Sequence, residues 1–354
     1  ASGVPRLDYP LIDGVVQDCP ALLLEPSRRN DITYSEDFSD SSWFKNANTS
    51  VSVNTAISPT GGNNATTLTI STAFPALYHT VTTTASTDYT FTFYVKNKNI
   101  SDITYRVYDA SNAADIISPT SYYSQIGDDW KRISISFTTP SGCLSTRVYL
   151  CSDNSAVGEV YIWGAQVEAG GYETSYIPTS GSTVTRNADV CNGAGTSAEF
   201  NDSEGVLFAE ISALANSGGN RRLGISDSSA TNRVIIGFTS SDNQIQAFTS
   251  NSGTQANMTQ TIDNVIQFNK IALKYKADDF ELWVNGFELD TDTGTAPTGL
   301  SEAAFDEGYA SSYFYGKTKQ LMTFSDSLSD SGLEQITSWR SFGEMAKGQL
   351  YTIE

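Results

Sequence analysis

The chain carries a single histidine, His79, and this limits the chemistry that it can perform. A Ser-His-Asp triad or a Cys-His dyad needs a histidine as its general base, and His79 is the only residue that could take this role. No Gly-x-Ser-x-Gly segment supplies a nucleophile, and His79 lies in the strand-like stretch 76–80. One histidine without paired cysteines also excludes a zinc hydrolase site. We therefore expect a structural role for His79 and no catalytic residues.

The cysteines do not form a metal-binding pattern. Cys19, Cys143, Cys151 and Cys191 include no Cys-x-x-Cys pair, which argues against structural zinc. Cys143 and Cys151 could face each other across one hairpin, and two free buried thiols fit the sequence equally well.

Aromatic residues in or near loops are the candidates for ligand binding. Their flat faces stack on the C–H faces of pyranose rings, while neighbouring amides and carboxylates bind the hydroxyls. Most aromatic side chains in a domain fill its core, as we expect for Trp163, which lies inside an apolar strand. The predicted glycan-binding residues are Trp43, Tyr122, Tyr123, Trp130, Tyr309, Tyr313 and Tyr315.

Calcium is the one cofactor for which the sequence offers ligands, and no cofactor is required. Asp290 and Asp292, in the stretch 290–294, place hard carboxylate oxygens on a predicted turn. The third acid and the distal glutamate of a complete EF-type loop are missing. Asp290 and Asp292 are therefore the candidate ligands for a calcium ion.

The charge of the chain excludes several classes of partner. The 354 residues include 21 basic and 40 acidic side chains, for a formal net charge of −19. Such a surface repels phosphate backbones and anionic membranes, so we expect neither nucleic-acid binding nor membrane insertion. No run of about 18 apolar residues occurs. The opening at Ala1, without a methionine, suggests a processed chain or a segment of a longer one.

Period-2 patterns predict an all-β chain with two antiparallel β-sandwiches. Residues 1–34 form a proline-rich extended leader, whose apolar run 21–24 is expected to dock onto a neighbouring domain or protomer. Residues 35–178 contain about eight short strands separated by turn clusters, which indicates a sandwich or jelly roll. Residues 179–203 are rich in Ser, Thr, Gly and Asn and predict a linker.

The second sandwich spans residues 204–354 and ends in one short helix. Its clearest hairpin lies at 279–289, where Asn285-Gly286 suits a type I′ turn. The helix is expected to begin near Ser331, because Ser331 and Glu334 have capping-box spacing.

Two blocks of sequence resemble a module common in phage and prophage structural proteins. The first runs from Glu25-Pro26-Ser27-Arg28-Arg29-Asn30 to Trp43, and the second from Val160-Tyr161-Ile162-Trp163-Gly164-Ala165-Gln166-Val167-Glu168 to Arg186. The resemblance covers residues 5–190 and implies a jelly roll of carbohydrate-binding-module type. It also implies a place on the tail or surface of a virion, outside cells, and it transfers no catalytic residue.

The C-terminal half resembles a concanavalin A-like or laminin-G sandwich. The resemblance rests on stretches 269–276 and 279–286, and on the strand at 315–324 that leads through Leu328-Ser329 into the helix. That superfamily hosts β-glucanases, whose Glu-x-Asp-x-x-Glu arrangement is absent here. The nearest stretch, Asp278-Asp279-Phe280-Glu281, has the wrong order and is expected to form a charged outer strand face.

These observations favour a non-catalytic virion protein, a tail fibre, spike or decoration protein, that binds a host-surface polysaccharide. Its expected partners are that glycan, other virion proteins and further copies of itself, with a trimer implied by the resemblance to fibres. Two alternatives stay open: a polysaccharide depolymerase with two carboxylates from distant positions, and a purely structural virion protein without a ligand.

Overall fold

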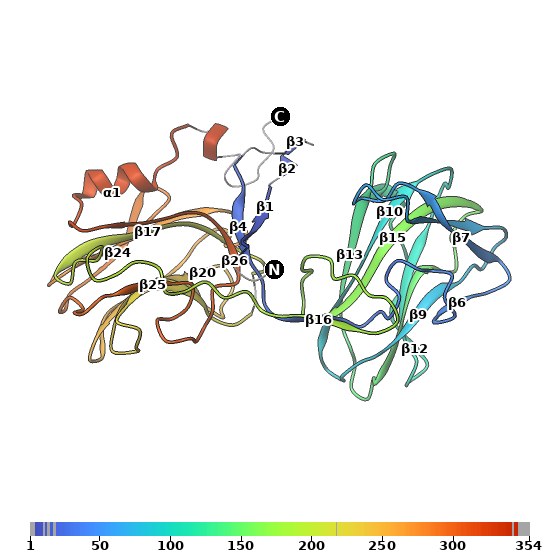
Figure 1. Ribbon diagram of the computed structural model, residues 1–354, viewed down its shortest axis with the longest axis horizontal. Helices are drawn as coiled ribbons and strands as arrows, with labels where there is room; N and C mark the ends of the chain where they lie inside the picture. Colours follow the sequence, from blue (N-terminus) through green and yellow to red (C-terminus); the bar gives the residue numbers. More distant parts are fainter. Residues whose placement is uncertain are drawn as a thin grey trace. The chain divides into compact units, whose positions relative to one another are not determined.

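The computed structural model describes residues 4–9, 11–12, 15–16, 19–216, 218–341 and 343–345. The chain folds into two compact units, which are considered separately here (Figure 1). The jelly-roll domain is Ser27–Asn187, and the discontinuous domain combines Ala1–Pro26 with Ala188–Glu354. The domain boundaries therefore differ from those expected, because the predicted leader and linker are each divided between the two units.

The jelly-roll domain contains two five-stranded antiparallel sheets. In order of pairing, the first consists of β13 (Lys131–Thr138), β10 (Asp88–Asn97), β15 (Gly158–Ala169), β8 (Ala65–Ile70) and β7 (Thr49–Ala56). The second consists of β12 (Ala114–Ser121), β11 (Thr104–Asp109), β14 (Ser145–Cys151), β9 (Leu77–Thr82) and β6 (Trp43–Lys45). Along the chain from β8 to β15, every connection except β11–β12 crosses to the other sheet. This is the strand order of a jelly roll.

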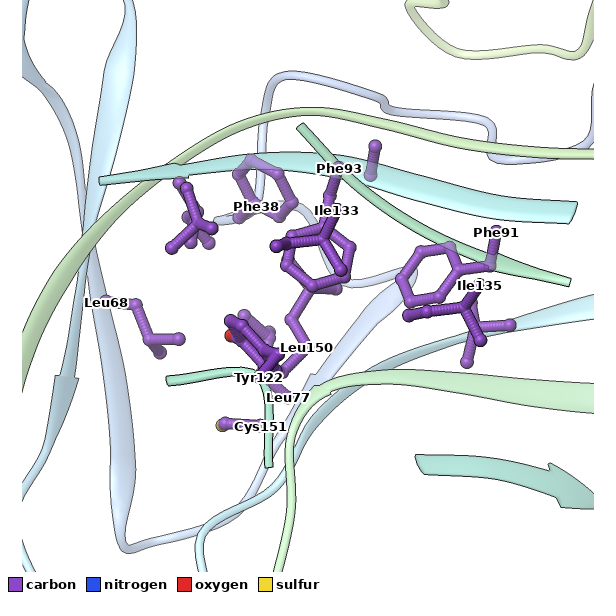
Figure 2. Close-up of a cluster of buried hydrophobic side chains, with 14 of the residues drawn as sticks. Phe38, Leu68, Leu77, Phe91, Phe93, Tyr122, Ile133, Ile135, Leu150 and Cys151 are labelled. Carbon is purple, nitrogen blue, oxygen red and sulfur yellow. The ribbon is translucent and has the colours of Figure 1, made fainter. Parts of the chain in front are cut away.

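The core of this domain follows from the predicted alternation. Phe91 and Phe93 of β10 and Ile133 and Ile135 of β13 point inward, where they meet Leu150 and other apolar residues of the opposite sheet (Figure 2). Each such side chain contributes about 1.5–3 kcal/mol by leaving water. The domain therefore has a sizeable core of its own and does not depend on a disulfide: all four cysteines of the chain are free, and Cys143 and Cys151 are buried thiols.

The two sequence blocks that carry the phage resemblance close the jelly roll. The side chain of Asn30, fully buried, donates to the carbonyls of Ala165 and Ile177 at 3.1 and 2.9 Å. Its Oδ1 accepts from the backbone amides of Ile32 and Val167. Asn30 thereby provides hydrogen-bond partners for buried backbone groups at the place where β15 and the two ends of the domain meet. Asn30 belongs to β5 (Arg28–Asn30), which pairs with β16 (Val184–Arg186).

A second buried network lies beside Asn30. Glu168 is fully buried and accepts hydrogen bonds from Gln166 Nε2 at 2.7 Å and from both the amide and the hydroxyl of Thr174. Arg28 Nε lies 3.6 Å from the same carboxylate. The conspicuous polar residues of the motif thus stabilise the domain and are not available to a ligand.

The discontinuous domain is also a sandwich of two antiparallel sheets. Its seven-stranded sheet consists of β1 (Arg6–Asp8), β4 (Ala21–Leu24), β26 (Gly316–Phe324), β17 (Glu204–Ala213), β22 (Asn269–Lys276), β23 (Phe280–Val284) and β24 (Phe287–Asp292). Its five-stranded sheet consists of β21 (Thr254–Thr261), β20 (Gln244–Asn251), β19 (Asn232–Phe238), β18 (Arg221–Ser226) and β25 (Glu302–Ala304). The strands β2 (Leu11–Ile12) and β3 (Val15–Val16) form a separate two-stranded sheet. The expected all-β class is confirmed.

The N-terminal segment becomes part of the second sandwich. Strand β4 pairs antiparallel with β26, and β1 pairs with β4. Leu24 enters the apolar core, which explains the predicted tendency of the run 21–24 to dock. The predicted turn at Asn285-Gly286 is confirmed, since both residues have positive φ.

One helix, α1 (Asp330–Thr337), covers part of the seven-stranded sheet. Leu333 and Ile336 pack with Phe208 and Trp283. The helix begins one residue earlier than expected, with Ser329 at the N-cap, so the predicted capping box of Ser331 and Glu334 does not form. Among the described residues, we find no helix whose length and apolar character would suit a membrane span.

Candidate functional site

Two of the predicted glycan-binding residues lie in the core, so this part of the prediction is wrong. Trp43 is 1% exposed and donates from Nε1 to the carbonyl of Tyr34 at 2.8 Å. Tyr122 has no exposed surface, and its hydroxyl donates to the carbonyl of Leu150 at 2.8 Å. Both polar atoms are satisfied internally, and neither ring can present a face to a sugar.

Tyr123 and Trp130 lie nearer the surface of the same domain but do not form a joint platform. Tyr123 is exposed in the short 3₁₀ helix η1 (Tyr123–Gln125). Trp130 is half-buried and donates to the carbonyl of Ile57 at 3.0 Å. Their assignment to a glycan site remains a prediction.

The predicted tyrosines of the discontinuous domain form one ring pair and one contact with an arginine. The rings of Tyr313 and Tyr315 are stacked with centroids 6.1 Å apart, and Arg233 lies 5.2 Å above the ring of exposed Tyr309. Glu307 binds both Arg222 at 2.5 Å and Arg233 at 3.1 Å. The guanidinium groups of Arg222 and Arg233 therefore share one internal carboxylate.

Asp290 and Asp292 lie in strand β24 and not on the expected turn. Asp290 accepts from Gln260 Nε2 at 2.8 Å, and Asp292 from the backbone amide of Asn257 at 2.9 Å. These bonds tie β24 to β21. Across the described residues, no three His, Cys, Asp or Glu side chains come together in a way that could hold a metal ion. Calcium binding by these two aspartates remains a prediction.

A stronger candidate site lies on the outer face of the sheet that contains β11 and β14. Each of these strands contains the triplet Arg-Val-Tyr, and the antiparallel register places Arg106 opposite Tyr149 and Tyr108 opposite Arg147. Since side chains alternate along a strand, the valines enter the core while arginines and tyrosines share the outer face. The repeated triplet is the sequence signal that could have identified this site, which the sequence analysis missed.

Two further strands extend this surface with aromatic rings. Tyr78 of β9 lies beside Tyr149, with ring centroids 4.6 Å apart. Phe44 of β6 stacks on Tyr78 at 4.7 Å with an interplanar angle of 22°, and it is 46% exposed. We call the following set the Arg/Tyr face: Phe44, Tyr78, Arg106, Tyr108, Arg147 and Tyr149.

The two arginines of the Arg/Tyr face differ in their charge environment. Arg106 pairs with Asp115 at 2.6 Å and lies 4.8 Å from the ring centroid of Tyr108. Arg147 lies over Tyr78 at 5.0 Å and over Tyr108 at 5.7 Å. Within the described ranges it forms no ion pair, and its Nε has no hydrogen-bond partner. The face therefore combines flat aromatic surface with one uncompensated guanidinium.

The hydroxyl group of Tyr149, beside these arginines, stays protonated at neutral pH. Burial raises the pKa of Tyr149, although Arg147 and Arg106 counteract it. The threonines at positions 80 and 82 of β9 are exposed on the same side of the sheet. The face thus offers both donors and acceptors beside its rings.

His79 lies on the opposite, inner side of β9. Its ring meets Trp43 edge-on at 5.1 Å, and Nε2 lies 3.2 Å from the hydroxyl of Thr33. Burial lowers its pKa to about 4. A buried imidazole between core residues supports the expected structural role.

The titration of His79 should make the jelly-roll domain sensitive to acid. The unfolded chain takes up the proton near pH 6.5, whereas the folded chain resists it down to about pH 4. The stabilisation is complete above pH 6.5, and about 3 kcal/mol is lost between pH 6.5 and 4. In His79→Gln, we expect the loss in unfolding free energy between pH 7 and 4.5 to be about 2 kcal/mol smaller than in wild type. Urea unfolding of both proteins at the two pH values measures this difference, and equal losses would refute the assignment.

The stretch that most resembles a hydrolase motif is engaged in an internal ion pair. Lys274 lies 2.8 Å from Asp279 and 2.6 Å from Glu281, and Glu281 also accepts from Trp283 Nε1. Glu281 is buried, so the expectation of a charged outer strand face is wrong at this residue. The reason is that helix α1 packs with Trp283 on this part of the sheet.

Comparisons with known proteins yield only distant likenesses. No protein-family model and no curated protein matches the chain. Among solved structures, CBM40 of the Ruminococcus gnavus IT-sialidase has 13% identity and a TM-score of 0.35, covering 42% of this chain and 97% of that one.

Two tandem-domain structures align with more of the chain. The CBM22-1-CBM22-2 tandem of Paenibacillus barcinonensis Xyn10C has 12% identity and a TM-score of 0.31, covering 84% of this chain and 97% of that one. Domains LG4-5 of the mouse laminin alpha1 chain have 9% identity and a TM-score of 0.29, covering 86% and 96%. At such TM-scores these likenesses carry no argument about function, and the fold assignment rests on the strand order described above.

Proposed function

We propose that this chain is a non-catalytic glycan-binding protein of a bacteriophage virion, and that the Arg/Tyr face of its jelly-roll domain binds a polysaccharide of the host surface. The phage assignment is supported by the two motif blocks that close the jelly roll. The binding role is supported by the aromatic surface on the outer side of the same domain.

The observation that carries the proposal is the row of Phe44, Tyr78 and Tyr149 across three neighbouring strands, in which Phe44 stacks on Tyr78 and the ring of Tyr149 is tilted by 44° to Tyr78. Strands in a sheet lie about 4.8 Å apart, so the three rings form a strip along one direction, with Phe44 exposed and Tyr149 buried. Exposed Phe44 would cost free energy in water without a partner. A pyranose ring that stacks there would find hydroxyl and guanidinium groups beside it for its own hydroxyls.

Single sugar contacts of this kind are weak, and attachment to a surface would come from several copies. We propose that the chain acts as a homo-oligomer on the virion, with a trimer as the assembly. When one copy is bound, the others are held close to the same polymer, so the overall affinity can exceed that of one site by about 10²–10⁴.

Removal of the exposed ring should weaken binding without unfolding the domain. We expect Phe44→Ala to bind the best ligand of a panel of bacterial surface polysaccharides about tenfold more weakly than wild type, because the ring contributes about 1–1.5 kcal/mol by stacking. Phe74→Ala is the matched control, since Phe74 is an exposed phenylalanine of the same domain outside the Arg/Tyr face. Calorimetry or biolayer interferometry measures the dissociation constants, and thermal unfolding checks the fold.

The same assay addresses the alternatives. New reducing ends during incubation would contradict the non-catalytic proposal. An absence of binding across the panel would favour a structural virion protein. Parallel wells with calcium or EGTA test the predicted role of Asp290 and Asp292, where a calcium effect should disappear in Asp290→Asn.

A further inference from the structure

Arg147 stands out because the acidic side chains of this protein compensate other arginines in comparable positions. Arg106 on the same face pairs with Asp115, and Arg222 and Arg233 share Glu307 in the other domain. The chain has 40 acidic residues, yet none of the described ones lies within ion-pair distance of Arg147. The guanidinium of Arg147 thus has no ion-pair partner among the described residues, and it lies between aromatic rings.

The surroundings of Arg147 hold its guanidinium in place. Tyr78 and Tyr108 flank it at 5.0 and 5.7 Å, and such contacts with ring faces restrict a long side chain that would otherwise be mobile. Val148, the next residue, anchors the backbone in the core. The group is half-buried, and its Nε has no hydrogen-bond partner among the described residues. A fixed, partly desolvated fork of this kind suits the two oxygens of a carboxylate.

A sugar that binds to the aromatic rings of Phe44 and Tyr78 would lie close to the guanidinium of Arg147. Tyr78 contacts both Phe44 and the guanidinium of Arg147, so one residue joins the stacking surface to the charge. Tyr78 and Arg147 are diagonal neighbours on the adjacent strands β9 and β14, about 7–8 Å apart or less, and Phe44 lies one strand further along the sheet. A sugar unit that contacts Tyr78 can span this distance with a carboxyl substituent.

From these contacts we infer that the Arg/Tyr face selects acidic glycans and that Arg147 binds the carboxylate of a uronic or similar sugar acid. This inference rests on the proposed glycan-binding function and specifies its ligand class. The net charge of −19 repels polyanions at long range, so affinity for an acidic polymer would have to come from a local site and not from general attraction.

The test compares acidic polymers with the same polymers after their carboxyl groups have been reduced to alcohols. The probes are alginate and polygalacturonate, each in native and carboxyl-reduced form. We expect wild type to bind at least one native polymer about 30-fold or more tightly than its reduced form. Arg147→Gln should lose this preference while it keeps the weaker affinity for the reduced polymer, and Arg147→Lys should keep only part of it, because an ammonium group lacks the planar fork.

Arg132→Gln is the matched control. Arg132 also lies over a tyrosine, Tyr94, but on β13 of the opposite sheet, and it is compensated by Glu173 at 3.5 Å. This variant should bind like wild type. Thermal unfolding of all variants shows whether any loss reflects misfolding, and the arginine-to-lysine variant provides a gentler substitution if Arg147→Gln is unstable.

The outcomes separate this inference from the proposed function. Equal binding of native and reduced polymers, together with weaker binding by Phe44→Ala, would overturn the acidic preference and leave glycan binding intact. Failure of wild type to bind either native polymer would also overturn it. Binding that Phe44→Ala leaves unchanged would refute the proposed site as a whole.

Discussion

Replacement of Asn30 by alanine should lower the free energy of unfolding of the jelly-roll domain by about 4 kcal/mol. The side chain makes four hydrogen bonds to backbone groups, and it has no exposed surface. Each buried backbone group left without a partner costs about 1–3 kcal/mol, and water that enters the vacated space recovers part of that. Since a domain is stabilised by only about 5–15 kcal/mol, this single amide supports a large fraction of the total.

Urea unfolding followed by tryptophan fluorescence measures the effect. Asn63→Ala is the control, because the exposed side chain of Asn63 makes a single long hydrogen bond of 3.4 Å; it should change stability by less than about 0.5 kcal/mol. With two domains, two transitions are expected, and only that of the jelly-roll domain should shift. A shift below about 1 kcal/mol would mean that the closing network contributes little.

Deletion of residues 1–26 should destabilise the other domain by about 4 kcal/mol. Strand β26 would lose its hydrogen-bonded partner β4, and the core would lose Leu24, whose burial is worth about 1.5–3 kcal/mol. Arg6, Glu25 and Asp189 would lose their shared ion pairs. The newly exposed edge of β26 also invites pairing with other chains, so we expect aggregation at high concentration.

The control for this deletion removes residues 1–5 only, which lie before β1. Thermal unfolding and light scattering of both truncated proteins measure stability and association. A synthetic peptide of residues 19–26, added in trans, should restore part of the lost stability by adding the strand back. If the deletion leaves the second transition in place, β4 is not an integral strand of this sandwich.

Strands with strict alternation were predictable from the sequence, whereas polar strands were not. Stretches such as 88–96 and 131–138 alternate because one side of each strand faces the core, and the structure has strands at both places. Strand β12 shows no such alternation, because it lies at a sheet edge, contains Pro119 and is mostly exposed, so burial imposes no pattern on it. The insertion of one domain into the other was missed, since pairing of β4 with β26 joins segments about 300 residues apart.

For the candidate site, too, the sequence identified residues within one strand but not the packing and register between strands. Local sequence identifies an aromatic residue and its strand, but Trp43 and Phe44 are adjacent, and only the packing of β6 decides which of them is buried. The sequence also contains Arg-Val-Tyr twice, but not the register that sets each arginine against a tyrosine of the other strand.

The amino-acid sequence was sufficient to establish the all-β class, the two sandwiches, the excess of acidic residues and the place of His79 in a strand, because these depend on composition and on the period of the side chains along one strand. The domain boundaries, the closing role of Asn30 and the uncompensated charge of Arg147 depend on which strands become neighbours. That choice is made by the packing of the whole core, where residues far apart in the chain compete for the same contacts, and no short stretch of sequence contains it.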